Sequence, residues 1–212
     1  MTRAEAKERN RRALLAAASE VVTRDGYRAR LDEIAERAGL TTGAVYSLFG
    51  SKAGLVVALV TEYLRPHYEE IARAVPADLG LLDAVDAFAR HSRRESDAPG
   101  AHAALSLQIT LLDMAVHDAA LATRLAESIE AQEDRLAELF TGRAHEGGVV
   151  TPHQAHRLVT ALRALFVGLT QGVVLGLARD ADEQFFADAA RALAAGVTRS
   201  GEGPVPGASD AH

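Results

Sequence analysis

The stretch TTGAVYSLFGSKAGL, residues 41–55, combines two kinds of helix face within one short segment. Val45 and Phe49 lie four residues apart, as on the buried face of a helix. The same segment also carries polar side chains that a buried face does not need: Tyr46, Ser47 and Lys52. We therefore expect a short helix that packs on one side and offers its other side to a partner.

Turn and capping residues surround this helix. An apolar pattern predicts a preceding helix over about 31–38, and Gly39 supplies the turn that follows it. Thr41 is a suitable N-cap for the next helix, and Ser51 for the one after it. An earlier helix is predicted over about 4–24. This order indicates a helix-turn-helix, whose second helix is presented to the major groove of DNA.

The rest of the chain repeats apolar residues at helical spacing, and no segment alternates like a strand. We predict an all-α protein of about nine helices, with a three-helix DNA-binding domain followed by a larger helical bundle. The predicted domains are residues 1–58, which contain the helix-turn-helix, residues 59–199, which form the larger bundle, and residues 200–212 as a disordered tail. Further helices are expected over 78–94, 101–117, 119–145, 152–179 and 182–199.

Composition limits the possible classes of protein. The 212 residues include no cysteine, which excludes disulfides, thiolate zinc sites and thiol nucleophiles. The N-terminus has no apolar signal segment, so we expect a cytoplasmic protein. The longest apolar run, 164–178, is shorter than a bilayer requires and is interpreted as a buried helix. We therefore expect that the protein does not bind a membrane.

Charge is divided unevenly along the chain, although the formal net charge is −6. Residues 1–58 hold ten Lys or Arg against seven Asp or Glu, whereas the remainder holds thirteen against twenty-two. This asymmetry indicates that the N-terminal part meets a polyanion while the rest has another task.

The residues give little support to catalysis or metal binding. No G-x-S-x-G, H-E-x-x-H or P-loop motif is present, so we expect no enzymatic activity, no catalytic residues and no cofactor. His153 and His156 lie three residues apart, but no third ligand is evident, and no metal site is predicted.

One ordered string of residues carries a family resemblance. It consists of Gly26-Tyr27, Asp32 to Tyr46, Phe49-Gly50-Ser51-Lys52 and Leu55. The string resembles the N-terminal domain of the TetR family of bacterial transcription regulators, densely over about residues 7–60 and not as a motif afterwards. The resemblance implies a homodimer that binds a pseudo-palindromic operator on double-stranded DNA.

The resemblance also implies roles for individual residues. Base edges would face Thr42, Gly43 and Ala44 at the start of the second helix of the motif. Phosphate oxygens would be bound by Tyr46, Ser47 and Lys52, and Thr41 is counted with this DNA-binding set.

Two positions depart from the family pattern. Many members have Ser or Thr before the helix that starts at Leu31, where this chain has Ala29-Arg30. We expect Arg30 to replace the neutral phosphate contact with a charged one. Gly54 stands where a better helix former is common, and it lowers the local helix propensity.

The larger part of the chain, residues 59–199, carries no comparable motif. The resemblance implies that these residues bind a small-molecule effector and form the dimer. Candidate ligand residues lie on or beside apolar helix faces, although packing explains them as well: His91, His102, Gln108 and Met114. Gly168, Gly172 and Gly176 recur every four residues and suggest a close helix contact, either between two subunits or within one.

These observations favour a homodimeric repressor that a small apolar or amphipathic effector releases from its operator. The alternative is an all-helical carrier or enzyme whose N-terminal bundle is only structural. A further alternative keeps the DNA-binding domain in an activator or a nucleoid-type protein.

Overall fold

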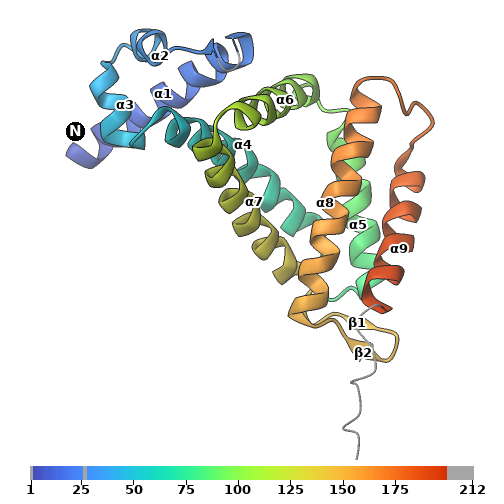
Figure 1. The fold of residues 1–212 in the computed structure, drawn as a ribbon. Coiled ribbons are helices and arrows are strands. Elements are labelled where there is room, and N and C mark those ends of the chain that lie inside the picture. The colour runs from blue at the N-terminus through green and yellow to red at the C-terminus, as the bar shows by residue number, and fades with distance from the viewer. Residues whose placement is uncertain (1, 26–27, 200–212) are drawn as a thin grey trace, which may run out of the picture. The chain divides into compact units, whose positions relative to one another are not determined.

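The structure, a computed structural model, describes residues 2–25 and 28–199, without the side chains of residues 60, 62–69, 72 and 197–199. Figure 1 shows the elements in chain order. The described helices are α1 Arg3–Asp25, α2 Leu31–Arg37, α3 Thr42–Phe49, α4 Lys52–Ala74, α5 Leu81–Glu95, α6 Ala101–His117, α7 Ala119–Phe140, α8 Pro152–Val174 and α9 Glu183–Arg199. A small antiparallel hairpin joins β1 Ala144–His145 to β2 Gly148–Val149. The predicted all-α fold class is confirmed.

The chain packs as two units that do not follow chain order. The N-terminal unit comprises Met1–Glu70 and Ala98–Gln132, and the C-terminal unit comprises Ile71–Asp97 and Glu133–His212. The boundary predicted at residue 58 lies inside α4, and the functional domains 1–58 and 59–199 stay a prediction. The predicted tail, 200–212, lies outside the described residues.

The N-terminal unit has one apolar core, to which four whole helices and parts of two others, α4 and α7, contribute. Leu14, Val21 and Val22 of α1 are fully buried in it, together with Val45 of α3. Helices α6 and α7 add further buried residues: Leu107, Leu111, Met114, Leu121 and Leu125. The core that seats α3 is therefore completed by residues far along the chain.

The turn between α2 and α3 is fixed by backbone hydrogen bonds. The Leu40 amide donates to the Ala35 carbonyl over 2.8 Å, and the Gly39 amide donates to the Glu36 carbonyl over 2.9 Å. This pattern requires a left-handed residue, and Gly39 supplies it with φ 68°. The predicted glycine turn is confirmed.

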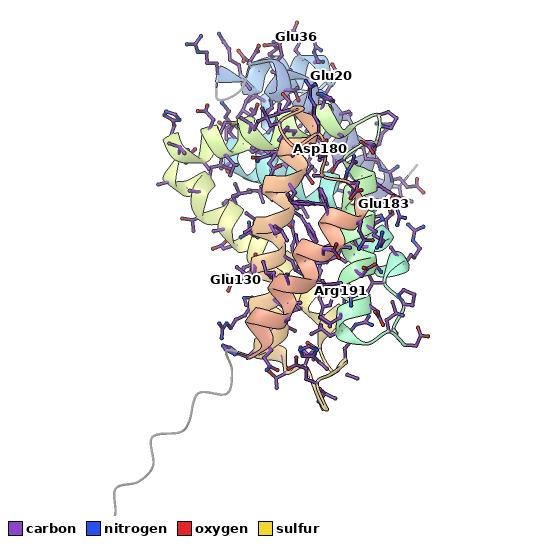
Figure 2. The ribbon with its side chains drawn as sticks, turned by 90° about the vertical axis from the view of Figure 1, so that its right-hand side faces the viewer. Glu20, Glu36, Glu130, Asp180, Glu183 and Arg191 are labelled. Carbon is purple, nitrogen blue, oxygen red and sulfur yellow. The ribbon has the colours of Figure 1, made fainter. Side chains whose placement is uncertain are left out.

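The C-terminal unit contains α5, α8 and α9 side by side (Figure 1). Its core includes a group of phenyl rings, in which the Phe166 centroid lies 5.1 Å from that of Phe88 and 6.2 Å from that of Phe186. Figure 2 labels Arg191 and Glu183 on α9. Arg191 Nη1 lies 3.7 Å from a carboxylate oxygen of Asp83 on α5.

Helix α8 is long and apolar enough to cross a membrane by length and composition alone. Core helices of globular proteins pass the same test, and Leu158 and Leu162 of α8 are fully buried in the C-terminal unit. Its start is closed by a capping box, in which the Thr151 hydroxyl accepts a hydrogen bond from the Gln154 amide over 3.2 Å.

Three predicted helices included residues that lie outside them. The helix predicted over 78–94 begins only at Leu81, and two others end early. Helix α7 ends at Phe140 rather than 145, and the hairpin follows it. There Arg143 donates hydrogen bonds to the carbonyls of Leu139, Pro76 and Leu79, which holds the chain after α7 against the loop before α5. Helix α8 ends at Val174 rather than 179, because Gly176 adopts φ 70° and closes the helix.

The start of α4 approaches the end of α3 closely. Ser51 caps α4, as predicted, by accepting a hydrogen bond from the Gly54 amide over 2.9 Å. A Cβ on Gly54 would lie 2.0 Å from the Phe49 carbonyl oxygen and 2.9 Å from Nη1 of Arg124. Close packing therefore explains the glycine that helix propensity disfavours.

Gly54→Ala should lower the free energy of unfolding by about 1–3 kcal/mol, because the methyl group overlaps a backbone carbonyl. Gly43→Ala is the matched control, since its Cβ would meet only the Thr41 hydroxyl oxygen at 3.6 Å. That variant should gain about 0.5–1 kcal/mol from helix propensity. Urea denaturation followed by circular dichroism compares the two, and equal stability of both variants would contradict the packing argument.

Candidate nucleic-acid interface

Helix α3 has one buried face and one exposed face, as its sequence predicts. Val45 is fully buried and Phe49 is partly buried against the same core. Tyr46 is 55 % exposed, and Ser47 and Gly43 are exposed as well. The polar face of α3 is thus held outward by the burial of the apolar one.

The start of α3 differs in one detail from the prediction. Thr41 occupies the N-cap position with extended backbone, but its side chain makes no capping hydrogen bond. The first turn is closed instead by the Ala44 amide, which donates to the Thr41 carbonyl over 2.9 Å. The first-turn amides of a helix attract anions, and the small residues Gly43 and Ala44 permit close approach.

Arg30 occupies the N-cap position of α2 and also has no side-chain cap. Its guanidinium pairs with the Asp32 carboxylate, with nitrogen–oxygen distances of 3.1 and 2.5 Å. The pair holds the pKa of Asp32 below its usual value. Both side chains are more than half exposed. Exposed ion pairs contribute little to stability, so Arg30 can exchange this carboxylate for a phosphate at small cost.

Lys52 begins α4 and is half-buried. Burial lowers the pKa of its ammonium group, and the negative charge of Asp118 acts in the opposite direction. Asp118 precedes α7, where its Oδ1 accepts hydrogen bonds from the amides of Ala120 and Leu121, both over 3.0 Å. The electrostatic environment of Lys52 is therefore set partly by the link between α6 and α7.

Sequence patterns did not indicate Asp118 or Arg124 as residues that affect the start of α4. Neither belongs to a motif, and both lie more than sixty residues from Lys52 along the chain. The unusual Gly54 was the only local sign that another element approaches this turn. Its close neighbour Arg124 is visible only in three dimensions.

The predicted ligand residues do not gather in one unit. His91 lies half-buried on α5 in the C-terminal unit, whereas the other three lie on α6 in the N-terminal unit: His102, Gln108 and Met114. His102 is exposed, Gln108 is half-buried and Met114 is packed in the core. Packing accounts for Met114, and the ligand-binding roles stay predictions.

The three glycines predicted for a dimer contact have different surroundings. A Cβ on Gly168 would meet no atom within 4 Å. A Cβ on Gly172 would lie 2.9 Å from the Ala178 Cβ of the same chain. Gly176 follows the end of α8 and is not on a helix face. Of the three, Gly172 fits tight packing within one subunit, and Gly168 leaves room for another chain.

Comparisons with known proteins agree with this arrangement. Residues 14–59 match the family described as bacterial regulatory proteins, tetR family. The matched range begins in α1, contains α2 and α3, and ends in the first part of α4. No curated protein matches the sequence.

Solved structures share the fold over most of the chain. A TetR-family transcriptional regulator from Rhodococcus sp. is 18 % identical with a TM-score of 0.63, over 90 % of this chain and 99 % of that one. The flavonoid-responsive regulator FrrA is 22 % identical with a TM-score of 0.60, over 91 % and 97 %. FadR from Bacillus subtilis, in complex with stearoyl-CoA, is 16 % identical with a TM-score of 0.57, over 88 % and 96 %.

Asp118→Asn should strengthen DNA binding about two- to fivefold at low salt, because it removes a negative charge beside Lys52. Asparagine preserves the cap of α7. The gain should shrink as salt rises. It should also shrink as pH rises, because loss of the carboxylate lowers the pKa of Lys52 further and the ammonium then deprotonates earlier.

Fluorescence anisotropy with a labelled duplex measures this effect. Asp180→Asn, an equal charge change in the C-terminal unit, is the control (Figure 2). Equal affinities of the two variants would show that Asp118 has no influence on the interface.

Proposed function

We propose that this DNA-binding transcription regulator, whose residues 14–59 form a tetR-family domain, acts as a homodimeric repressor that a small effector releases from its operator. The main support for this proposal is that α3 has one buried and one exposed face. The burial of Val45 turns Tyr46 and Ser47 outward, where both are exposed. Binding to chromosomal DNA also implies a cytoplasmic location.

In this proposal α3 enters the major groove. Thr42, Gly43 and Ala44 face base edges, where methyl groups and the Thr42 hydroxyl read the sequence. The remaining residues of the set fix the register on phosphates: Arg30, Thr41, Tyr46, Ser47 and Lys52. The pairing of Arg30 with Asp32 is compatible with this role, because both side chains are exposed.

A dimer would place two copies of α3 on the two halves of a pseudo-palindromic operator. Exposed apolar side chains near the junction of α8 and α9 support such an interface: Leu175, Leu177 and Phe185. Leu177 is 80 % exposed, and Gly168 on α8 leaves open space beside it for a second chain. Burial of this surface against its own copy would remove apolar area from water.

The proposed effector is a small apolar or amphipathic molecule. FrrA is described as flavonoid-responsive, and the FadR structure holds stearoyl-CoA. Both ligands have large apolar parts, and the C-terminal unit of this chain has an aromatic core around Phe88 and Phe166. His91 is the candidate residue in that unit, and the roles expected for His102, Gln108 and Met114 of the N-terminal unit stay predictions.

The test is selection of bound duplexes from a random-sequence library at near-physiological salt. The wild type should enrich one short inverted repeat, and the double variant Tyr46→Ala, Lys52→Ala should enrich none. Affinity for the repeat should fall steeply with salt, because phosphate contacts release counterions. A folded wild type that enriches no sequence would favour a carrier or an enzyme, and enrichment without sequence preference would favour a nucleoid-type protein.

Gly168→Gln should shift the protein from dimer to monomer, because a long polar side chain would fill the open space on α8. Gly172→Gln is unsuitable as a test of the interface, since its Cβ already overlaps Ala178 within the subunit. Sedimentation velocity measures the change, and circular dichroism checks that the helices persist. A full dimer of Gly168→Gln would place the interface elsewhere.

A further inference from the structure

A cation outside the DNA-facing set lies where α3, α4 and α7 of the N-terminal unit meet. Nη1 of Arg124 on α7 lies 2.9 Å from the place that a Cβ on Gly54 would occupy, and the Phe49 carbonyl oxygen lies 2.0 Å from the same point. The guanidinium and the carbonyl therefore both border the space that glycine leaves open.

The Phe49 carbonyl group lies at the end of α3, where it can attract a cation. Phe49 is the last residue of α3, and the carbonyl groups at a helix C-terminus carry partial negative charge. A cation at that end stabilises the last turn. The last turn of α3 ends with the Gly50 amide donating to the Tyr46 carbonyl over 2.9 Å, so it includes a residue of the proposed DNA-binding set.

The first half of α7 is anchored beside α4, which keeps Arg124 in place. Leu121 and Leu125 are buried in the N-terminal core. One turn further, the Ser128 hydroxyl lies 3.3 Å from the hydroxyl of Thr61 on α4. The same helix continues to Phe140, and in the C-terminal unit its Glu133 accepts a hydrogen bond from Thr160 of α8 over 2.8 Å.

We infer that Arg124 is a positioning residue for DNA recognition. It stabilises the C-terminal end of α3 and makes the position of α3 depend on α7. Arg124 touches no base or phosphate in this arrangement and acts through Tyr46 and its neighbours. The inference rests on the proposed function and adds a regulatory connection to it. A displacement of α7 by effector binding would move the Arg124 guanidinium away from the end of α3 and weaken DNA binding.

The test compares full-length Arg124→Gln with Arg135→Gln, which removes an equal charge from an exposed position farther along α7. Affinity for the selected inverted repeat is measured over a range of salt. Arg124→Gln should bind about three- to tenfold more weakly, as expected for loss of a helix-terminus cation in each of two heads. The salt slope should remain that of the wild type, because no phosphate contact is lost. Arg124→Lys should recover part of the affinity.

Hydrogen exchange of the Gly50 amide without DNA gives a second measurement, independent of any operator. Exchange should be faster in Arg124→Gln than in Arg135→Gln. Equal affinities and equal exchange of the two variants would overturn the inference, and so would a salt slope reduced by about one, which marks a lost phosphate contact. A wild type that binds no duplex would refute the proposed function, while the exchange comparison would still decide the role of Arg124.

Discussion

Burial of Val45 in the core shared with α1 and α2 is the contact on which the N-terminal unit depends. Since side chains four residues apart share a face, this single anchor decides that Phe49 also turns inward and that Tyr46 and Ser47 turn outward. The capped turns on either side, at Gly39 and Ser51, then limit how far α3 can rotate. The recognition surface is thus a consequence of packing, and its polar residues need no interactions of their own to hold their orientation.

The sequence predicted most features of α3 that depend on neighbours along the chain, although the side chain of Thr41 makes no capping hydrogen bond. The periodicity of α3, the turn at Gly39 and the cap at Ser51 are local, and each was confirmed. The end of α8 was misplaced because Leu175 and Leu177 continue the apolar pattern past Gly176, which closes the helix with φ 70°. The end of α7 was misplaced because Gly142, which adopts φ 77°, was not recognised as a stop signal. The roles of Asp118 and Arg124 were beyond prediction for another reason: their effect arises from helices that meet only after folding.

Acidic groups accompany the basic ones throughout the proposed interface. Asp32 pairs with Arg30, and Asp118 lies within electrostatic range of Lys52. Each acid reduces the attraction of its partner for phosphate, which suits the proposed release from DNA when an effector binds. Strong uncompensated charge would favour tight binding to any duplex, because phosphate contacts carry no sequence information.

The discontinuous composition of the N-terminal unit affects how such a protein can diversify. Leu107, Leu111 and Leu121 complete the core under α3, although the matched family domain ends at residue 59. A unit built in this way cannot be transferred between proteins as one continuous stretch of gene without leaving apolar surface uncovered. Recombination would therefore have to carry residues 98–132 as well. A change in the proposed operator preference is more easily reached by point substitutions on the outer face of α3.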